Sequence, residues 1–83
     1  MNIEVVEAKV LETLQSLVPK KKTVTLEKNF REELGIDSIQ LVSMIALFEE
    51  ELNFNSLDAI SEVDLTEILT GKDIVNVIMK YQK

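Results

Sequence analysis

The chain has no cysteine and no histidine, and among its 83 residues only 2 are glycine and 1 is proline. These absences exclude thiolate nucleophiles, disulfide bonds and imidazole general bases, together with the usual protein ligands of zinc. The remaining polar residues do not pair a nucleophile with a base at a recognisable spacing, so we expect neither a catalytic site nor a metal site. A reactive thiol, if the protein uses one, must belong to an attached group.

The charge balance is acidic, with 15 Asp and Glu residues against 9 Lys and Arg residues and a formal net charge of −6. Nucleic acid and anionic lipid are bound through Lys and Arg, so partners with basic patches are expected instead. No apolar run is long enough for a membrane span, and Glu4 stands where a signal peptide would be basic. These features predict a cytoplasmic protein.

A chain of this length can close only one modest hydrophobic core, so we expect a single domain over residues 1–83. The first helix is predicted from one apolar stripe at helical spacing: Ile3, Val6, Val10, Leu14 and Leu17. It should end at Pro19, because a proline pushes the preceding residue out of the α region. The run Lys20–Lys22 is then expected to be a solvated turn.

The segment from Pro19 to Asp37 has no clear period and is long for a structureless loop in so small a domain. Five apolar residues can anchor it to the core: Val24, Leu26, Phe30, Leu34 and Ile36. Gly35 suits a left-handed conformation before the next helix. We expect an ordered loop that contains a single helical turn.

A second helix is predicted from about Ser38 to Leu52, with Asp37 or Ser38 as its N-cap. Its core stripe comprises Leu41, Met44, Ile45, Phe48 and Leu52. Its second apolar stripe comprises Ile39, Val42 and Ala46. This second stripe is either buried under the loop or the third helix, or it forms an exposed patch that partners touch or a lip over a cavity. We favour partner contact for Ile39 and Val42.

The remaining chain predicts a short helix within residues 57–67 and a clearer last helix. Thr70–Asp73 is typical of a capping sequence, and four apolar residues follow at helical spacing: Ile74, Val77, Ile78 and Tyr81. The predicted fold is all-α, a small four-helix bundle of three main helices and one short helix, with a long ordered loop between helices one and two. No heptad seam persists beyond one helix, so we expect a monomer.

The segment from Phe30 to Leu52 resembles the acyl carrier proteins without a gap. In that family a phenylalanine, acids and Leu-Gly precede an Asp-Ser-Leu or Asp-Ser-Ile triplet that opens the second helix. The resemblance implies that Ser38 carries 4′-phosphopantetheine, transferred from coenzyme A. It also implies that Asp37 serves the Mg²⁺-dependent phosphopantetheinyl transferase during loading. An isolated Asp-Ser dipeptide would be only an N-cap, and the surrounding match favours the carrier interpretation.

The chemistry of such a carrier suits this chain. A phosphodiester on Ser38 would lie at a helix N-terminus, where free N–H groups and the helix dipole favour negative charge. The arm ends in a thiol, so acyl groups can be held as thioesters by a chain that has no cysteine. The expected function is carriage of acyl intermediates between enzymes, without catalysis.

Glu49, Glu50 and Glu51 form either a solvated helix end or a surface that acyl-processing enzymes recognise through basic patches. Carriers of primary fatty-acid synthesis tend to have acids early in this helix, where this chain has Gln40 and Ser43. We therefore favour a specialised polyketide, lipid or secondary-metabolite pathway over housekeeping type II fatty acid synthesis. A different class of function also stays open, an unmodified helical interaction module in which Ser38 is only a cap.

Overall fold

The computed structural model describes residues 2–18, 23–62 and 64–82. Within them lie the α-helices α1 (Ile3–Leu17), α2 (Ser38–Leu52), α3 (Ser56–Glu62) and α4 (Gly71–Lys80), with a 3₁₀ turn η1 (Leu65–Glu67) before α4. The described residues form no β-strand, only isolated bridges joining Asn29 to Thr70 and Phe54 to Gln82. The predicted all-α class is confirmed, and the predicted turn at Lys20–Lys22 lies outside the described residues.

Local signals define the ends of α1 and α4. The Asn2 side chain accepts a hydrogen bond from the Glu4 N–H at 2.8 Å, and α1 stops at Leu17 with Val18 extended, as the following proline predicts. At the start of α4, Thr70 Oγ1 accepts from the Asp73 N–H and Asp73 Oδ2 accepts from the Thr70 N–H. This capping box confirms the predicted start of the last helix.

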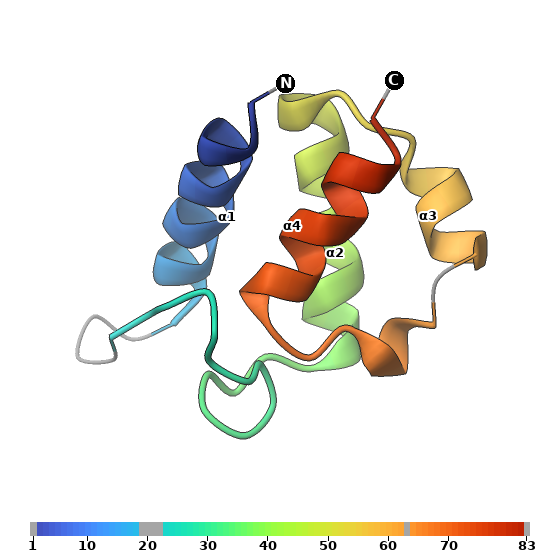
Figure 1. The fold of residues 1–83 in the computed structure, drawn as a ribbon. Coiled ribbons are helices and arrows are strands. Elements are labelled where there is room, and N and C mark those ends of the chain that lie inside the picture. The colour runs from blue at the N-terminus through green and yellow to red at the C-terminus, as the bar shows by residue number, and fades with distance from the viewer. Residues whose placement is uncertain (1, 19–22, 63, 83) are drawn as a thin grey trace.

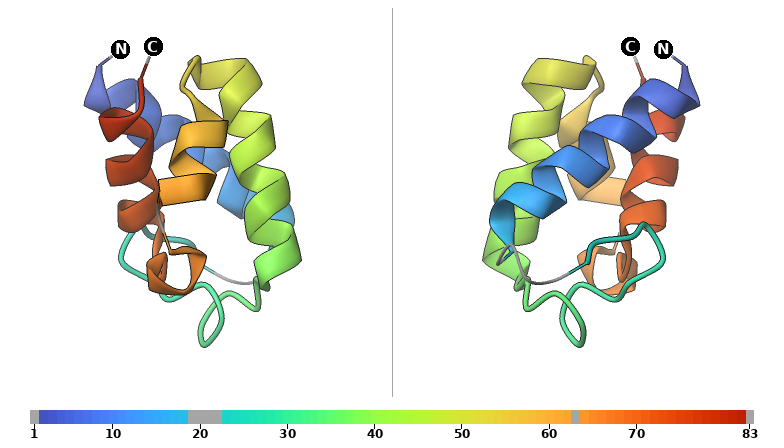
Figure 2. Two further views of the ribbon diagram at one scale, coloured as in Figure 1. Left: turned by 90° about the vertical axis from the view of Figure 1, so that its right-hand side faces the viewer. Right: turned by 90° about the vertical axis from the view of Figure 1, so that its left-hand side faces the viewer.

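The long helices converge on one core. α1 packs against α4, and α3 packs against α2 (Figure 1). α2 and α4 rise in the same direction while α1 descends across them (Figure 2). The start of α2 therefore lies at the same end of the molecule as the start of α4 and the long loop. The largest fully buried side chains include all 3 phenylalanines of the chain: Phe30, Phe48 and Phe54.

The burial of α1 and α4 differs slightly from the predicted stripes. Three α1 residues are fully buried, Val6, Val10 and Leu14, whereas Ile3 and Leu17 at its two ends are exposed. In α4 the buried apolar side chains are Ile74, Val75 and Ile78, while Val77 and Tyr81 are only half-buried. Ile3 and Leu17 lie in the outermost turns of α1, where the core no longer covers the stripe.

The loop between α1 and α2 is ordered over its described part, as predicted. The Phe30 N–H donates to the Leu69 carbonyl at 2.8 Å, and the Lys72 N–H donates to the Leu26 carbonyl at 2.9 Å. These bonds join the loop to the segment that enters α4. The predicted single helical turn is present at residues 29–33, where the Glu33 N–H donates to the Asn29 carbonyl at 3.0 Å.

All five predicted loop anchors contact the core. Phe30, Leu34 and Ile36 are buried, and Val24 and Leu26 are partly buried against the core. α3 begins at Ser56, one residue before the window in which we expected it, and η1 occupies the end of that window. The loop thus adds its own apolar side chains to the core that the helices form.

Candidate functional site

Ser38 is the first residue of α2, and its side chain is exposed. The N-cap is Asp37, whose Oδ1 accepts from the Gln40 N–H at 2.9 Å, while Gln40 Oε1 accepts from the Asp37 N–H at 3.2 Å. This capping box decides between the two predicted N-caps in favour of Asp37. The Ser38 hydroxyl is therefore not used to cap the helix.

The chain reaches Ser38 through a turn that the sequence specifies locally. Gly35 has φ +69°, the left-handed conformation predicted for it, which a residue with a Cβ adopts only at a cost. The next residue, Ile36, is buried, and its N–H donates to the Phe30 carbonyl at 2.8 Å. The turn is thus anchored directly before the exposed Asp37–Ser38 pair.

Arg31 also contacts Ser38, which the sequence did not predict. Its Nη2 donates a hydrogen bond to Ser38 Oγ at 2.5 Å across seven residues of chain. The Arg31 N–H donates to Asn29 Oδ1 at 2.9 Å, and the Glu32 N–H donates to the same oxygen. Arg31 is the single arginine of the chain, and this is the only feature of the sequence that draws attention to it. The loop that carries it has no period from which a contact with Ser38 could be inferred.

The surroundings of Ser38 fit a phosphodiester. Ser38 lies in an open hollow of about 500 Å³ whose lining includes Arg31, Gly35 and Ile39. The first turn of a helix leaves four N–H groups without intrahelical acceptors. The capping box takes those of Asp37 and Gln40, and those of Ser38 and Ile39 have no acceptor among the described residues. Two free donors and a guanidinium are a suitable environment for an anion.

The second apolar stripe of α2 is exposed. Ile39 retains 78% of its accessible surface, Val42 retains 40%, and Ala46 is also exposed. These values exclude the alternative that the stripe is buried under the loop or under α3. The exposed surface begins immediately beside Ser38 and follows α2 towards its C-terminal half.

The three glutamates at the end of α2 are not equivalent. Glu51 Oε2 lies 3.0 Å from Lys9 Nζ, so this carboxylate pairs with α1. The hydrogen bond to Glu51 is the main reason that the pKa of Lys9 is raised above its ordinary value of 10.5. Glu50 is exposed and Glu49 is half-buried. Glu50 is therefore an exposed carboxylate of this run that makes no contact with Lys9.

An apolar-lined groove of about 190 Å³ lies between α1 and α2. Its walls include Leu17 from α1 and Ile39, Met44 and Leu47 from α2. Met44, a residue of the predicted core stripe, is buried and lines this groove. Phe48 of the same stripe is fully buried in the core. Beneath Ser38, a more enclosed space of about 10 Å³ lies among Phe30, Leu41 and Ile68 and can hold no acyl chain.

The family model described as phosphopantetheine attachment site matches residues 8–78. The chain belongs to this family. Its members are carriers, not enzymes, and bear covalently attached 4′-phosphopantetheine, on which acyl groups are held. Their partners are a phosphopantetheinyl transferase and acyl-processing enzymes. We found no match to the chain among curated proteins or solved structures. No helix in the described part of the chain is long and apolar enough to cross a membrane.

Proposed function

We propose that the prosthetic group is attached at Ser38 and that this carrier domain, spanning residues 1–83, shuttles acyl thioesters between enzymes of a specialised pathway. The observation that carries the attachment is the exposed Ser38 hydroxyl at the start of α2, which is not used as a cap because Asp37 caps the helix. The hollow around it and the neighbouring Arg31 guanidinium support the same assignment. When bound, 4′-phosphopantetheine supplies the thiol that the chain lacks.

Loading transfers the phosphopantetheinyl group from coenzyme A to Ser38. A bond forms between Ser38 Oγ and the phosphorus that bears pantetheine, and the pyrophosphate bond of coenzyme A breaks. Adenosine 3′,5′-bisphosphate leaves, and the hydroxyl proton passes to solvent. Asp37 directly precedes Ser38 in the chain and keeps one carboxylate oxygen beyond the one that caps α2. We assign this carboxylate to the Mg²⁺-dependent transferase during loading, because Mg²⁺ prefers oxygen ligands.

Intact-mass spectrometry tests the attachment site. The protein is incubated with coenzyme A, Mg²⁺ and a promiscuous phosphopantetheinyl transferase, alongside Ser38→Ala and Ser43→Ala. Ser43 is the matched control, because it is also an exposed serine of α2. We expect one phosphopantetheinyl group on the wild type and on Ser43→Ala, and none on Ser38→Ala. An unmodified wild type would favour the helical interaction module, and equal loading of all three would place the arm elsewhere.

The proposed partner surface consists of Ile39, Val42, Ala46, Glu49 and Glu50. It combines the exposed apolar stripe of α2 with the two glutamates that Lys9 does not pair. Basic patches on acyl-processing enzymes fit the glutamates, because complementary charges raise the rate of encounter. We propose that the carrier meets these enzymes as a monomer, which leaves the whole surface available to them.

The specialised pathway is supported by the start of α2, which has no acidic residue in its first turn. Gln40 and Ser43 stand where carriers of primary fatty-acid synthesis tend to have acids. Elongation by housekeeping fatty-acid enzymes should therefore be slower on this carrier than on their own. The double variant Gln40→Glu, Ser43→Glu should recover part of the rate, because it introduces acids at these two positions. Glutamate at position 40 can still complete the capping box, so the start of α2 is preserved. If the housekeeping enzymes elongated acyl groups as fast on this carrier as on their own, the specialised assignment would be wrong.

A further inference from the structure

Among the described residues, the Arg31 guanidinium is the one side-chain group that forms a hydrogen bond with Ser38 Oγ. We propose that Arg31 is a positioning residue that binds the phosphodiester of the arm once Ser38 is loaded. The inference rests on the proposed attachment at Ser38. It adds a residue of this chain whose role changes when the hydroxyl becomes a phosphate ester.

The charge around Ser38 calls for a cation. Loading places a negative phosphodiester next to the Asp37 carboxylate, in a chain whose formal net charge is already −6. Like charges so close repel each other, and this repulsion is reduced when a cation lies between or beside them. Within the described residues, Arg31 makes no ion pair, and its side chain bonds only to Ser38. Its charge is therefore available to the phosphate.

The backbone of Arg31 is held in place on the Ser38 side of the loop. The Arg31 N–H is bound by Asn29 Oδ1, and Asn29 itself bridges to Thr70 at the start of α4. The turn that carries the guanidinium is thus tied to the helical framework. Ordering it around a phosphate costs less entropy than ordering a free loop would.

The chemistry of the two groups is complementary. A phosphodiester has two oxygens that carry its charge, and a guanidinium offers donors in a planar fork that can reach both. A lysine at the same place supplies the charge but not the fork. The free N–H groups of Ser38 and Ile39 approach the same anion from the helix side. Loading should therefore convert one hydrogen bond to a hydroxyl into several charge-assisted bonds.

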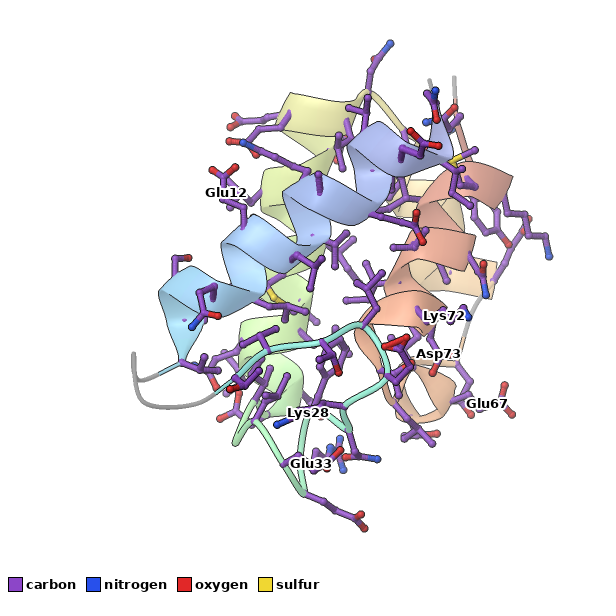
Figure 3. All side chains as sticks on the ribbon, turned by 60° about the vertical axis from the view of Figure 1, so that its left-hand side comes forward. Glu12, Lys28, Glu33, Glu67, Lys72 and Asp73 are labelled. Carbon is purple, nitrogen blue, oxygen red and sulfur yellow. The ribbon has the colours of Figure 1, made fainter. Side chains whose placement is uncertain are left out.

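Nuclear magnetic resonance tests this role without any activity assay. Because Arg31 is the only arginine, its side-chain Nε–H gives a single arginine signal in a ¹H–¹⁵N spectrum. The spectrum is recorded for apo and loaded wild type and for Ser38→Ala. The ³¹P signal of the arm is recorded for loaded wild type, Arg31→Ala and Arg31→Lys. The control is Lys72→Ala, which removes an exposed cation from the first turn of α4 (Figure 3).

We expect the Arg31 Nε–H signal to move on loading to a position different from those in the apo protein and in Ser38→Ala. The ³¹P signal should shift in Arg31→Ala, shift less in Arg31→Lys, and match the wild type in Lys72→Ala. Superimposable ³¹P signals in wild type and Arg31→Ala would overturn the proposal. So would an Arg31 signal in the loaded protein that coincides with that of Ser38→Ala. Mass spectrometry of each sample separates these outcomes from a failure of Ser38 to load.

Discussion

Replacing Asp37 with alanine should lower the free energy of unfolding by about 1 kcal/mol, the usual cost of removing an aspartate N-cap. The substitution removes the carboxylate that accepts from the Gln40 N–H at 2.9 Å, so one N–H of the first turn loses its acceptor. In a domain of this size, a loss of about 1 kcal/mol lowers the melting temperature by about 4–8 °C. Differential scanning calorimetry of the apo protein measures this change.

Asparagine at position 37 separates the cap from the charge. Its side-chain oxygen accepts the same hydrogen bond, and asparagine caps helices as well as aspartate does. Only the favourable interaction of the charge with the helix N-terminus is lost, worth about 0.3–1 kcal/mol. The melting temperature of Asp37→Asn should therefore lie between those of the wild type and Asp37→Ala.

Loading should follow a different order from stability. If the Asp37 carboxylate serves the transferase and its Mg²⁺, neither variant can replace it. Losing a bond to a charged group costs about 1.5–3 kcal/mol. The initial rate should thus fall about tenfold to a hundredfold in both variants. The rate is read by intact mass well below both melting temperatures, with Ser43→Ala as the control. An Asp37→Asn protein that loads at the wild-type rate would refute the proposed role and leave Asp37 as a cap alone.

Three further predictions concern stability. Gly35→Ala should cost about 1–2 kcal/mol through its φ of +69° alone, since nothing lies within 4 Å of the added Cβ. Gly71→Ala should cost about 1 kcal/mol by overpacking, because its Cβ would lie 3.0 Å from Leu26 Cδ2. Urea denaturation measures both costs, and only the second should shrink in a Leu26→Ala background. The Thr66 hydroxyl and N–H hold the pKa of Asp64 below its ordinary value of 3.8. The resulting stabilisation is complete above pH 3.8 and is lost as the pH falls through the lowered pKa. Thr66→Val should therefore make acid unfolding less steep in that range, and an unchanged acid profile would contradict this.

The parts of the fold that could be predicted depend on local rules. The bounds of α2 match the prediction because Asp37 and the left-handed Gly35 are signals within a few residues of its start. The same holds for the capping box of Thr70 at α4. The exposure of Ser38 follows from these bounds, since the first residue of a capped helix faces solvent unless a neighbour covers it.

The contacts that could not be predicted join distant segments through an irregular chain. Arg31 reaches Ser38 across a loop without periodicity, so no spacing rule brings the two together. Lys9 pairs with Glu51 only because α1 crosses α2 near that residue. The approach of Leu26 to Gly71 depends on how the loop packs over α4. These contacts arise from tertiary packing, which composition and helical periodicity do not encode.

These tertiary contacts change how the proposed partner surface should work. The pairing of Glu51 with Lys9 engages one carboxylate of the acidic run, and the first turn of α2 contributes no acid. Exposed charges of this kind mainly raise the rate of encounter and contribute about 1 kcal/mol or less to affinity. Burial of a full isoleucine side chain is worth about 1.5–3 kcal/mol, and Ile39 still exposes 78% of its surface. Affinity should therefore depend chiefly on the apolar residue beside Ser38, while Glu50 affects mainly the association rate. Partners of this carrier should accordingly offer an apolar pocket near the arm, with their basic residues placed towards the far end of α2.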